Sequence, residues 1–235
     1  MHINSNPIMN SSKLINKGFT LTELLIGALM AGIIVAGLGY ALVSLLGFDK
    51  NSQADGERRV EIDRALSYIS KDIREAYSVS VPTGYTVPNT TCNVNTPVLH
   101  IRTRDNHINA PTEGGIKVRH TIYYYRDIST CSASQAVWLR PGMIMRVSKN
   151  SDESWFPPNP PATLPSVGGS GTNELMDAVQ TPTGGFTCPS GTQTGTNGFY
   201  ACIENSRAVT IHIFGRGSRG VTMPGQATRV AVRGR

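Results

Sequence analysis

The feature that most constrains this chain is the apolar run from Phe19 to Phe48. It covers about 30 residues, which is long enough to cross a bilayer as a helix. Glu23 is the only acidic or basic side chain in the run. An unpaired charge in a membrane helix costs roughly 2.5 to 3.5 kcal/mol on insertion scales, so we expect Glu23 to have a partner. No basic side chain within the run supplies one.

The residues directly before the run offer such a partner. Lys17 and Gly18 precede Phe19, and cleavage after Gly18 would create an α-amine on Phe19 that is cationic at neutral pH. This amine would lie within about one turn of Glu23 on its own helix. It would also be able to meet Glu23 of a neighbouring copy when such helices pack side by side. Cleavage would therefore give the carboxylate its counter-charge.

This junction resembles the processing site of a type IV prepilin, also called a class III signal, over the run KGFTLTELLI at residues 17–26. The motif joins a Gly-Phe junction, a glutamate at a fixed offset and a long apolar helix. The resemblance implies cleavage after Gly18 by prepilin peptidase and N-methylation of Phe19. It also implies that Glu23 docks the subunit into a growing filament.

Two ordinary membrane segments are the alternatives. A Sec signal peptide needs a short apolar core before its cleavage site, and residues 1–18 contain none. A plain single-pass anchor leaves Glu23 unexplained. Lys13 and Lys17 precede the span, which predicts a cytoplasmic N-terminus and a head outside the inner (cytoplasmic) membrane.

The helical pattern continues beyond the span. No proline occurs between Pro7 and Pro82, so nothing forces a break. From Glu57 onward, apolar residues recur at spacings of three and four, which is typical of an amphipathic helix with one buried face. These residues are Ile62, Leu66, Ile69, Ile73 and Tyr77. The regions we expect are a leader over 1–18, a transmembrane and filament-core helix over 19–48, the amphipathic second half of that helix over 49–80, and an extracytoplasmic β-rich head over 81–235.

The head shows an extended pattern in place of a helical one. Runs rich in β-branched and aromatic residues alternate with turn signals. The expected strands are Val98 to Arg104, Lys117 to Arg126, Ala136 to Arg140, Met143 to Ser148, Ala208 to Phe214 and Thr228 to Arg233. Prolines predict a long surface loop over 155–171, and a Gly- and Thr-rich stretch predicts a second loop over 181–198. The expected fold class is α+β, with an antiparallel sheet packed on the outer half of the long helix, as in the pilin fold.

All four cysteines follow the span, on the side predicted to be outside the cytoplasm. An even number in an oxidising compartment favours disulfides, although four cysteines allow three pairings. We favour Cys188 with Cys202, which would close a loop of about 15 residues worth roughly 3 kcal/mol. Cys92 would then pair with Cys131. A zinc site is disfavoured because the sequence has no C-x-x-C motif and no nearby histidine pair.

Other motifs give little reason to expect catalysis, a cofactor or a metal. Gly215, Gly217 and Gly220 spell G-x-G-x-x-G, but the residues after them cannot begin the helix that dinucleotide binding needs. No serine lies in a hydrolase nucleophile motif. The four histidines after the span have no spacing typical of metal ligands, and we expect them on the surface or on strand faces: His100, His107, His120 and His212. We therefore expect a protein that is not an enzyme.

Two features bear on nucleic-acid binding. The net charge of +6 is only mildly basic, so it permits a polyanionic partner without requiring one. Tyr123 and Tyr125 alternate with Tyr124 along an expected strand, so they should face one side of the sheet and Tyr124 the other. We therefore expect core packing for this cluster in preference to contact with nucleic acid.

A second resemblance is to the PilW-like minor pilins and the J-type minor pseudopilins of type II secretion. It rests on Ile69 to Ala76, on Ile122 to Tyr125 followed by Trp138 to Arg140, and on Arg233 to Arg235. It implies a low-copy subunit at or near the tip of an extracellular or periplasmic filament. The implied partners are other pilins, prepilin peptidase and the inner-membrane pilus assembly platform.

The sequence leaves other functions open. One alternative is a filament-borne adhesin or receptor that binds DNA or polysaccharide. Another is a membrane-anchored enzyme with no need for Glu23. A motility pilus, a competence pilus and a secretion pseudopilus all use the same N-terminal chemistry, so the sequence does not choose among them.

Overall fold

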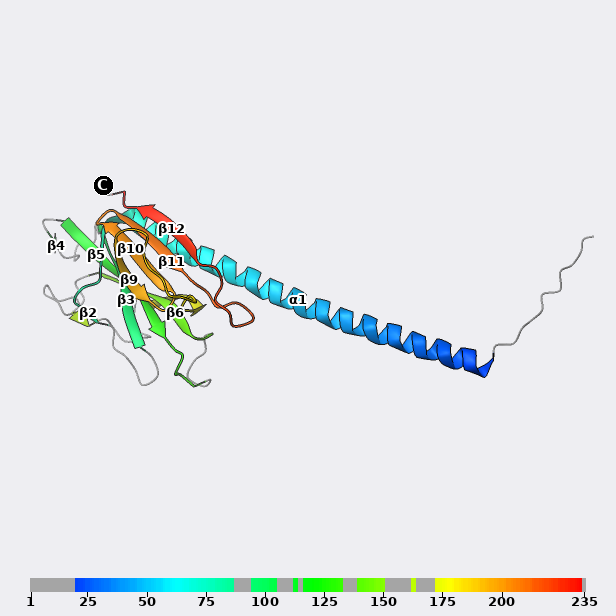
Figure 1. Cartoon of the computed structure of the whole chain (residues 1–235). Helices are drawn as coiled ribbons and strands as arrows, with labels where there is room; N and C mark the ends of the chain where they lie inside the picture. Colours follow the sequence, from blue (N-terminus) through cyan, green and yellow to red (C-terminus); the bar gives the residue numbers. More distant parts are fainter. Residues whose placement is uncertain are drawn as a thin grey trace, which may run out of the picture. The chain divides into compact units, whose positions relative to one another are not determined.

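The computed structural model describes residues 20–86, 94–104, 112–113, 116–132, 139–150, 162–163 and 172–233 (Figure 1). The chain divides into two compact units, Met1–Lys50 and Asn51–Arg235, and each is considered by itself. The helix α1 (Leu21–Glu75) contributes its first residues to one unit and its last residues to the other.

The first unit consists of the apolar part of α1. Every described residue from Thr20 to Lys50 is exposed, including large apolar side chains such as Leu24 and Ile33. Among the described residues, α1 is the one helix that is long and apolar enough to cross a membrane. Its side chains have nothing within this unit to pack against, and such a continuous apolar surface is unfavourable in water.

The second unit begins with the amphipathic part of α1. Ile62, Leu66, Ile69 and Ile73 are buried at the spacing expected from the sequence. The helix ends at Glu75, however, and not near residue 80. Residues 76–80 form strand β1 (Ala76–Ser80), which pairs antiparallel with β3 (Val94–Arg104). Tyr77 is consequently 38% exposed, and the expectation that it continues the buried helix face was wrong.

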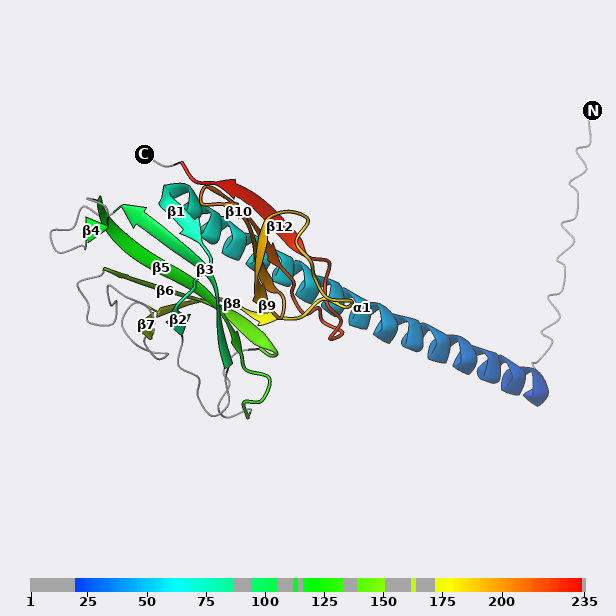
Figure 2. The same ribbon diagram turned by 60° about the vertical axis from the view of Figure 1, so that its left-hand side comes forward.

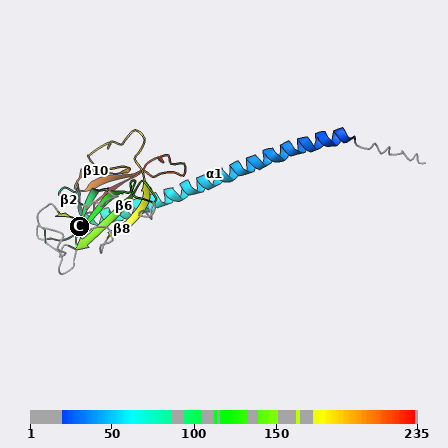
Figure 3. The ribbon, with the colours of Figure 1, turned by 90° about the horizontal axis from the view of Figure 1, so that it is seen from below.

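The first sheet is a meander, as expected. Its order is β1-β3-β5-β6-β8, and every neighbouring pair is antiparallel. The further strands are β5 (Ile116–Asp127), β6 (Gly142–Asn150) and β8 (Thr172–Val179), and the short β4 (Thr112–Glu113) pairs with β5. Figure 3 shows β6 and β8 side by side. The sequence did not predict β8, because its run of Glu174, Leu175 and Met176 favours helix over strand.

The head contains a second sheet, where the sequence predicted only one. This sheet has the order β12-β11-β10-β9, and Figure 2 labels its strands β9, β10 and β12. Its strands are β9 (Thr192–Thr196), β10 (Phe199–Asn205), β11 (Ala208–Ile213) and β12 (Gln226–Ala231). The strand β9 lies inside the expected loop 181–198. Thr192, Thr194 and Thr196 recur with the period of a strand and pair with β10, which overcomes the weak strand preference of Gly195.

Two further expectations concern segments that the structure describes only in part. Most of the Pro-rich segment 155–171 lies outside the described residues, but Ala162–Thr163 forms β7, which pairs in parallel with β2 (Tyr85–Thr86). The expected strand from Ala136 to Arg140 is described only at Leu139 and Arg140, and neither belongs to a strand. The Leu139 amide donates to the Asp177 carboxylate at 2.8 Å, and the Leu139 carbonyl accepts from the Ala178 amide at 3.0 Å.

The main core lies between α1 and both sheets. One buried cluster joins apolar residues of α1 with residues from strands of each sheet, including Tyr123 and Tyr125. Tyr124 belongs to a second, smaller cluster on the other side of the first sheet. The prediction that Tyr123 and Tyr125 share one face, and that Tyr124 takes the other, is confirmed.

Candidate functional site

Glu23 forms a capping box with Thr20 at the start of α1. The Thr20 amide and hydroxyl both donate to Glu23 Oε2, at 3.1 Å and 2.9 Å, and the Glu23 amide donates to Thr20 Oγ1 at 3.3 Å. This reciprocal pattern satisfies two backbone donors that a helix start leaves without partners. A negative charge in the first turn also complements the helix dipole.

We did not predict the capping box from the sequence, although Thr20 and Glu23 have the T-x-x-E spacing that indicates one. The expected partner of Glu23 was the Phe19 amine alone. No described residue donates to Glu23 Oε1, so one oxygen is held by the helix start and the other faces no described donor. Gly18 and Phe19 lie outside the described residues, so cleavage after Gly18 and methylation of Phe19 stay predictions.

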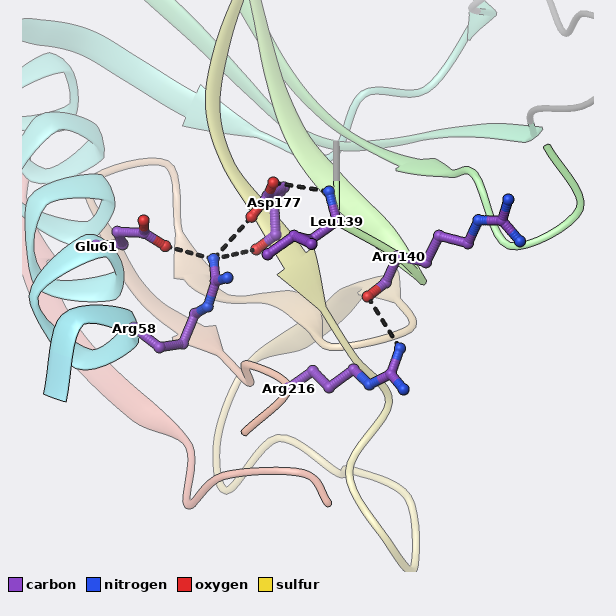
Figure 4. A network of polar contacts seen from close by, with 6 residues as sticks. All are labelled: Arg58, Glu61, Leu139, Arg140, Asp177 and Arg216. Carbon is purple, nitrogen blue, oxygen red and sulfur yellow. Dashed lines mark hydrogen bonds and ion pairs between the residues drawn. The ribbon is translucent and has the colours of Figure 1, made fainter. Parts of the chain in front are cut away.

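An arginine in the second unit ties α1 to the edge of the first sheet (Figure 4). Arg58 Nη1 lies 2.7 Å from Asp177 Oδ1 and also pairs with Glu61. The side chains of Arg58 and Asp177 are only 12% and 15% exposed. Asp177 Oδ2 accepts from the Leu139 amide at 2.8 Å. One carboxylate therefore holds α1, β8 and the segment before β6 together.

A second polar contact lies farther along α1. Asp72 Oδ2 accepts from the Tyr123 hydroxyl at 2.7 Å and from Arg146 Nε at 2.9 Å. Burial, with the nearby Asp72 carboxylate, raises the pKa of Tyr123, so its hydroxyl remains a donor. Burial alone would lower the pKa of Arg146, but its attraction to Asp72 outweighs this and raises that pKa. Both contacts orient α1 on the sheet and give no sign of a reactive group.

Two histidines form a buried pair within the first sheet. His100 Nε2 lies 3.0 Å from His120 Nδ1, and His100 Nδ1 lies 3.3 Å from Ser80 Oγ. His100 is 5% exposed and His120 is 2% exposed. Burial, together with the nearby His120 and Arg102, lowers the pKa of His100 to about 3.

His100 and His120 lie on strands β3 and β5, as expected, and they are buried there because these neighbouring strands bring the two rings together. His212 lies in β11, half-buried against Phe186, and His107 lies outside the described residues. Across the described part of the chain, no group of three His, Cys, Asp or Glu side chains could hold a metal ion.

The predicted Cys188–Cys202 disulfide is confirmed. Its Cα atoms lie 5.6 Å apart, and it joins the segment before β9 to β10. Cys131 is buried and disulfide-bonded. Its expected partner, Cys92, lies outside the described residues, so that pairing stays a prediction.

The G-x-G-x-x-G glycines lie in the turn between β11 and β12, and no helix begins there. A Cβ on Gly215 would lie 3.0 Å from Ile62 Cδ1, and one on Gly217 would lie 3.2 Å from Asp55 Oδ1. The Ser218 amide also donates to Asp55 Oδ1 at 2.7 Å. These two glycines therefore allow the turn to pack closely on α1.

Comparisons with protein-family models, with curated proteins and with solved structures found no match to this chain. The resemblance to prepilins therefore rests on the sequence motif.

Proposed function

We propose that this chain is a structural assembly subunit: a minor pilin or pseudopilin processed by prepilin peptidase and incorporated into a type IV pilus or a type II secretion-like pseudopilus. The observation that carries the proposal is at the start of α1. The apolar part of α1, up to Phe48, has no packing partner within its own unit, and its single carboxylate lies in the first turn, four residues after Phe19 of the Gly-Phe junction. We assign the chain no catalytic activity.

The capping box gives Glu23 two roles in this proposal. In the precursor, Glu23 Oε2 is held by Thr20, so the carboxylate is oriented at the helix start before any partner arrives. After cleavage, Glu23 Oε1 accepts the charged Phe19 amine of the same subunit or of a neighbouring one. A charge-assisted hydrogen bond of this kind offsets the cost of placing the carboxylate in an apolar environment.

The apolar half of α1 has one environment before assembly and another afterwards. The precursor spans the inner membrane once, with its N-terminus in the cytoplasm and its head outside. On assembly, the same helix leaves the lipid and packs against helices of other pilins in a hetero-oligomeric filament. Gly27, Gly32, Gly37 and Gly39 carry no side chain and lie in open space, so another helix could approach closely at these positions.

Processing is tested by replacing Gly18 with a bulky residue, for example Gly18→Trp. In cells with prepilin peptidase, the variant should accumulate in the membrane at the mass of the full precursor, while the unchanged chain is shortened. Gly27→Trp, a matched change inside the span, should be shortened normally. Normal cleavage and filament incorporation of the Gly18 variant would refute the proposal.

A further inference from the structure

Four arginines from separate parts of the chain gather at one end of the second unit. Arg74 lies in the last turn of α1, and Arg104 is the last residue of β3. Arg207 lies in the turn between β10 and β11, and Arg233 follows β12. All four residues are exposed, and we refer to them as the arginine patch.

Backbone hydrogen bonds bring three of these arginines together. The Arg233 amide donates to the Arg74 carbonyl at 3.4 Å, and the Val232 amide donates to the Arg207 carbonyl at 2.7 Å. The segment after β12 therefore contacts both the last turn of α1 and the β10–β11 turn. Figure 2 shows the end of β12 beside the last turn of α1.

Arg104 joins the patch through β1. Its neighbour Thr103 pairs with Ala76, the residue that directly follows α1. The Arg104 guanidinium carbon lies 6.0 Å from the centre of the Tyr77 ring. The face of an aromatic ring attracts a guanidinium group without cancelling its charge. Tyr77 therefore holds Arg104 at the start of β1 and leaves its charge free for a ligand.

No carboxylate of the described residues forms an ion pair with the arginine patch. Asp72 and Glu204 each pair with an arginine outside the patch. Glu75, next to Arg74 in the sequence, is exposed and forms no ion pair within the part of the chain that the structure describes. Clustered cations without balancing anions repel one another, so binding of an external polyanion is favoured.

We propose that the arginine patch binds the phosphate backbone of double-stranded DNA without regard to base sequence. A planar guanidinium group donates two parallel hydrogen bonds to one phosphate. Duplex DNA carries one negative charge per about 1.7 Å of its axis, so several of its phosphates are within reach of cations that lie close together. An acidic polysaccharide with one carboxylate per sugar ring has a lower charge density and matches the patch less well. This binding goes beyond the assembly proposal and does not depend on it, because all four arginines belong to the second unit.

The test uses the full chain in nanodiscs of phosphatidylcholine, a lipid without net charge that does not compete for DNA. Fluorescence anisotropy of a labelled duplex of about 20 base pairs measures the Kd between about 50 and 200 mM NaCl. Four phosphate contacts predict that the logarithm of the association constant falls against the logarithm of the salt concentration with a slope of about −3.6. Two duplexes of unrelated sequence should bind equally well.

Two double variants remove charge from different elements of the patch. Arg207→Ala combined with Arg233→Ala should raise the Kd at least about tenfold at about 50 mM NaCl and make the salt slope shallower by about two. Arg74→Ala combined with Arg104→Ala should have the same effect. Near-ultraviolet circular dichroism reports whether each variant is folded, and because the two pairs lie on different elements, a folding defect in one leaves the other to decide.

The matched control is Arg216→Ala combined with Arg219→Ala. It removes the same charge from exposed arginines of the β11–β12 turn, outside the patch, and should bind like the unchanged chain. The proposal is overturned if the duplex does not bind at about 100 μM protein in about 50 mM NaCl, which is the weak end of non-specific DNA binding. It is equally overturned if the control weakens binding as much as the patch variants do, or if alginate, an acidic polysaccharide, binds as tightly as the duplex.

Discussion

The buried His100–His120 pair makes the stability of the head depend on pH. The pKa of His100 falls from 6.5 to about 3 because the ring is buried and lies beside His120 and Arg102. Below about pH 6.5 the unfolded chain binds a proton at this ring that the folded head does not bind. The free energy of unfolding of the head therefore has its full value above this pH and decreases progressively as the pH falls toward 3.

The size of the loss follows from the two pKa values. At pH 5 the unfolded ring is almost fully protonated and the folded ring almost fully neutral. The difference amounts to about 2 kcal/mol of unfolding free energy relative to pH 8. No allowance for solvent screening is needed, because His100 is only 5% exposed.

The assay is a urea titration of the full chain in nanodiscs at pH 8 and at pH 5, followed by near-ultraviolet circular dichroism from the packed tyrosines. The matched variant is His100→Gln, which keeps hydrogen-bonding groups near Ser80 and His120 but does not titrate. The unchanged head should lose about 2 kcal/mol more than the variant between the two pH values. His212, whose pKa is also lowered by burial, is present in both proteins, so its contribution cancels. Equal losses in the two proteins would refute the reasoning.

Two further predictions concern contacts that join separate elements. Asp177→Ala should lower the unfolding free energy by about 2 to 4 kcal/mol, because it leaves Arg58 without its buried partner and the Leu139 amide without an acceptor. Glu61→Ala removes the exposed partner of the same arginine and should cost less than about 1 kcal/mol, so equal costs in urea titrations would contradict this assignment. Replacing Cys188 and Cys202 together by alanine should cost about 3 kcal/mol under non-reducing conditions, and an unchanged urea midpoint would show that the loop is held by other contacts.

Features that depend on local periodicity could be predicted from the sequence. The spacing of Ile62, Leu66 and Ile73 identified the buried face of α1, because helix geometry brings these positions onto one side. Successive side chains of a strand point to opposite faces, which predicted that Tyr123 and Tyr124 lie on different sides of the sheet. The short separation of Cys188 and Cys202 made their pairing the natural choice.

Features that depend on distant pairing could not be predicted. Tyr77 continues the helical spacing of Ile73, but pairing of β1 with β3 ends the helix before it. The strand β8 has residues that favour helix and is held in place by β6. Tertiary context outweighs local propensity in both cases.

The candidate sites also differ in whether they depend on a local sequence pattern or on pairing between separate segments. The capping box was predictable, since Thr20 and Glu23 are three residues apart and carry its sequence pattern. The buried His100–His120 pair was not, because the two rings lie on separate strands, β3 and β5, that only the folded sheet brings together.

The central claim is tested most directly by the N-terminus of the protein recovered from its native cells. Intact-mass measurement with N-terminal sequencing identifies the first residue and any methyl group on it. Our account predicts a chain that begins at N-methylated Phe19. A chain that still begins at Met1, or that is cut elsewhere, would contradict the account and leave the apolar half of α1 as a plain membrane anchor.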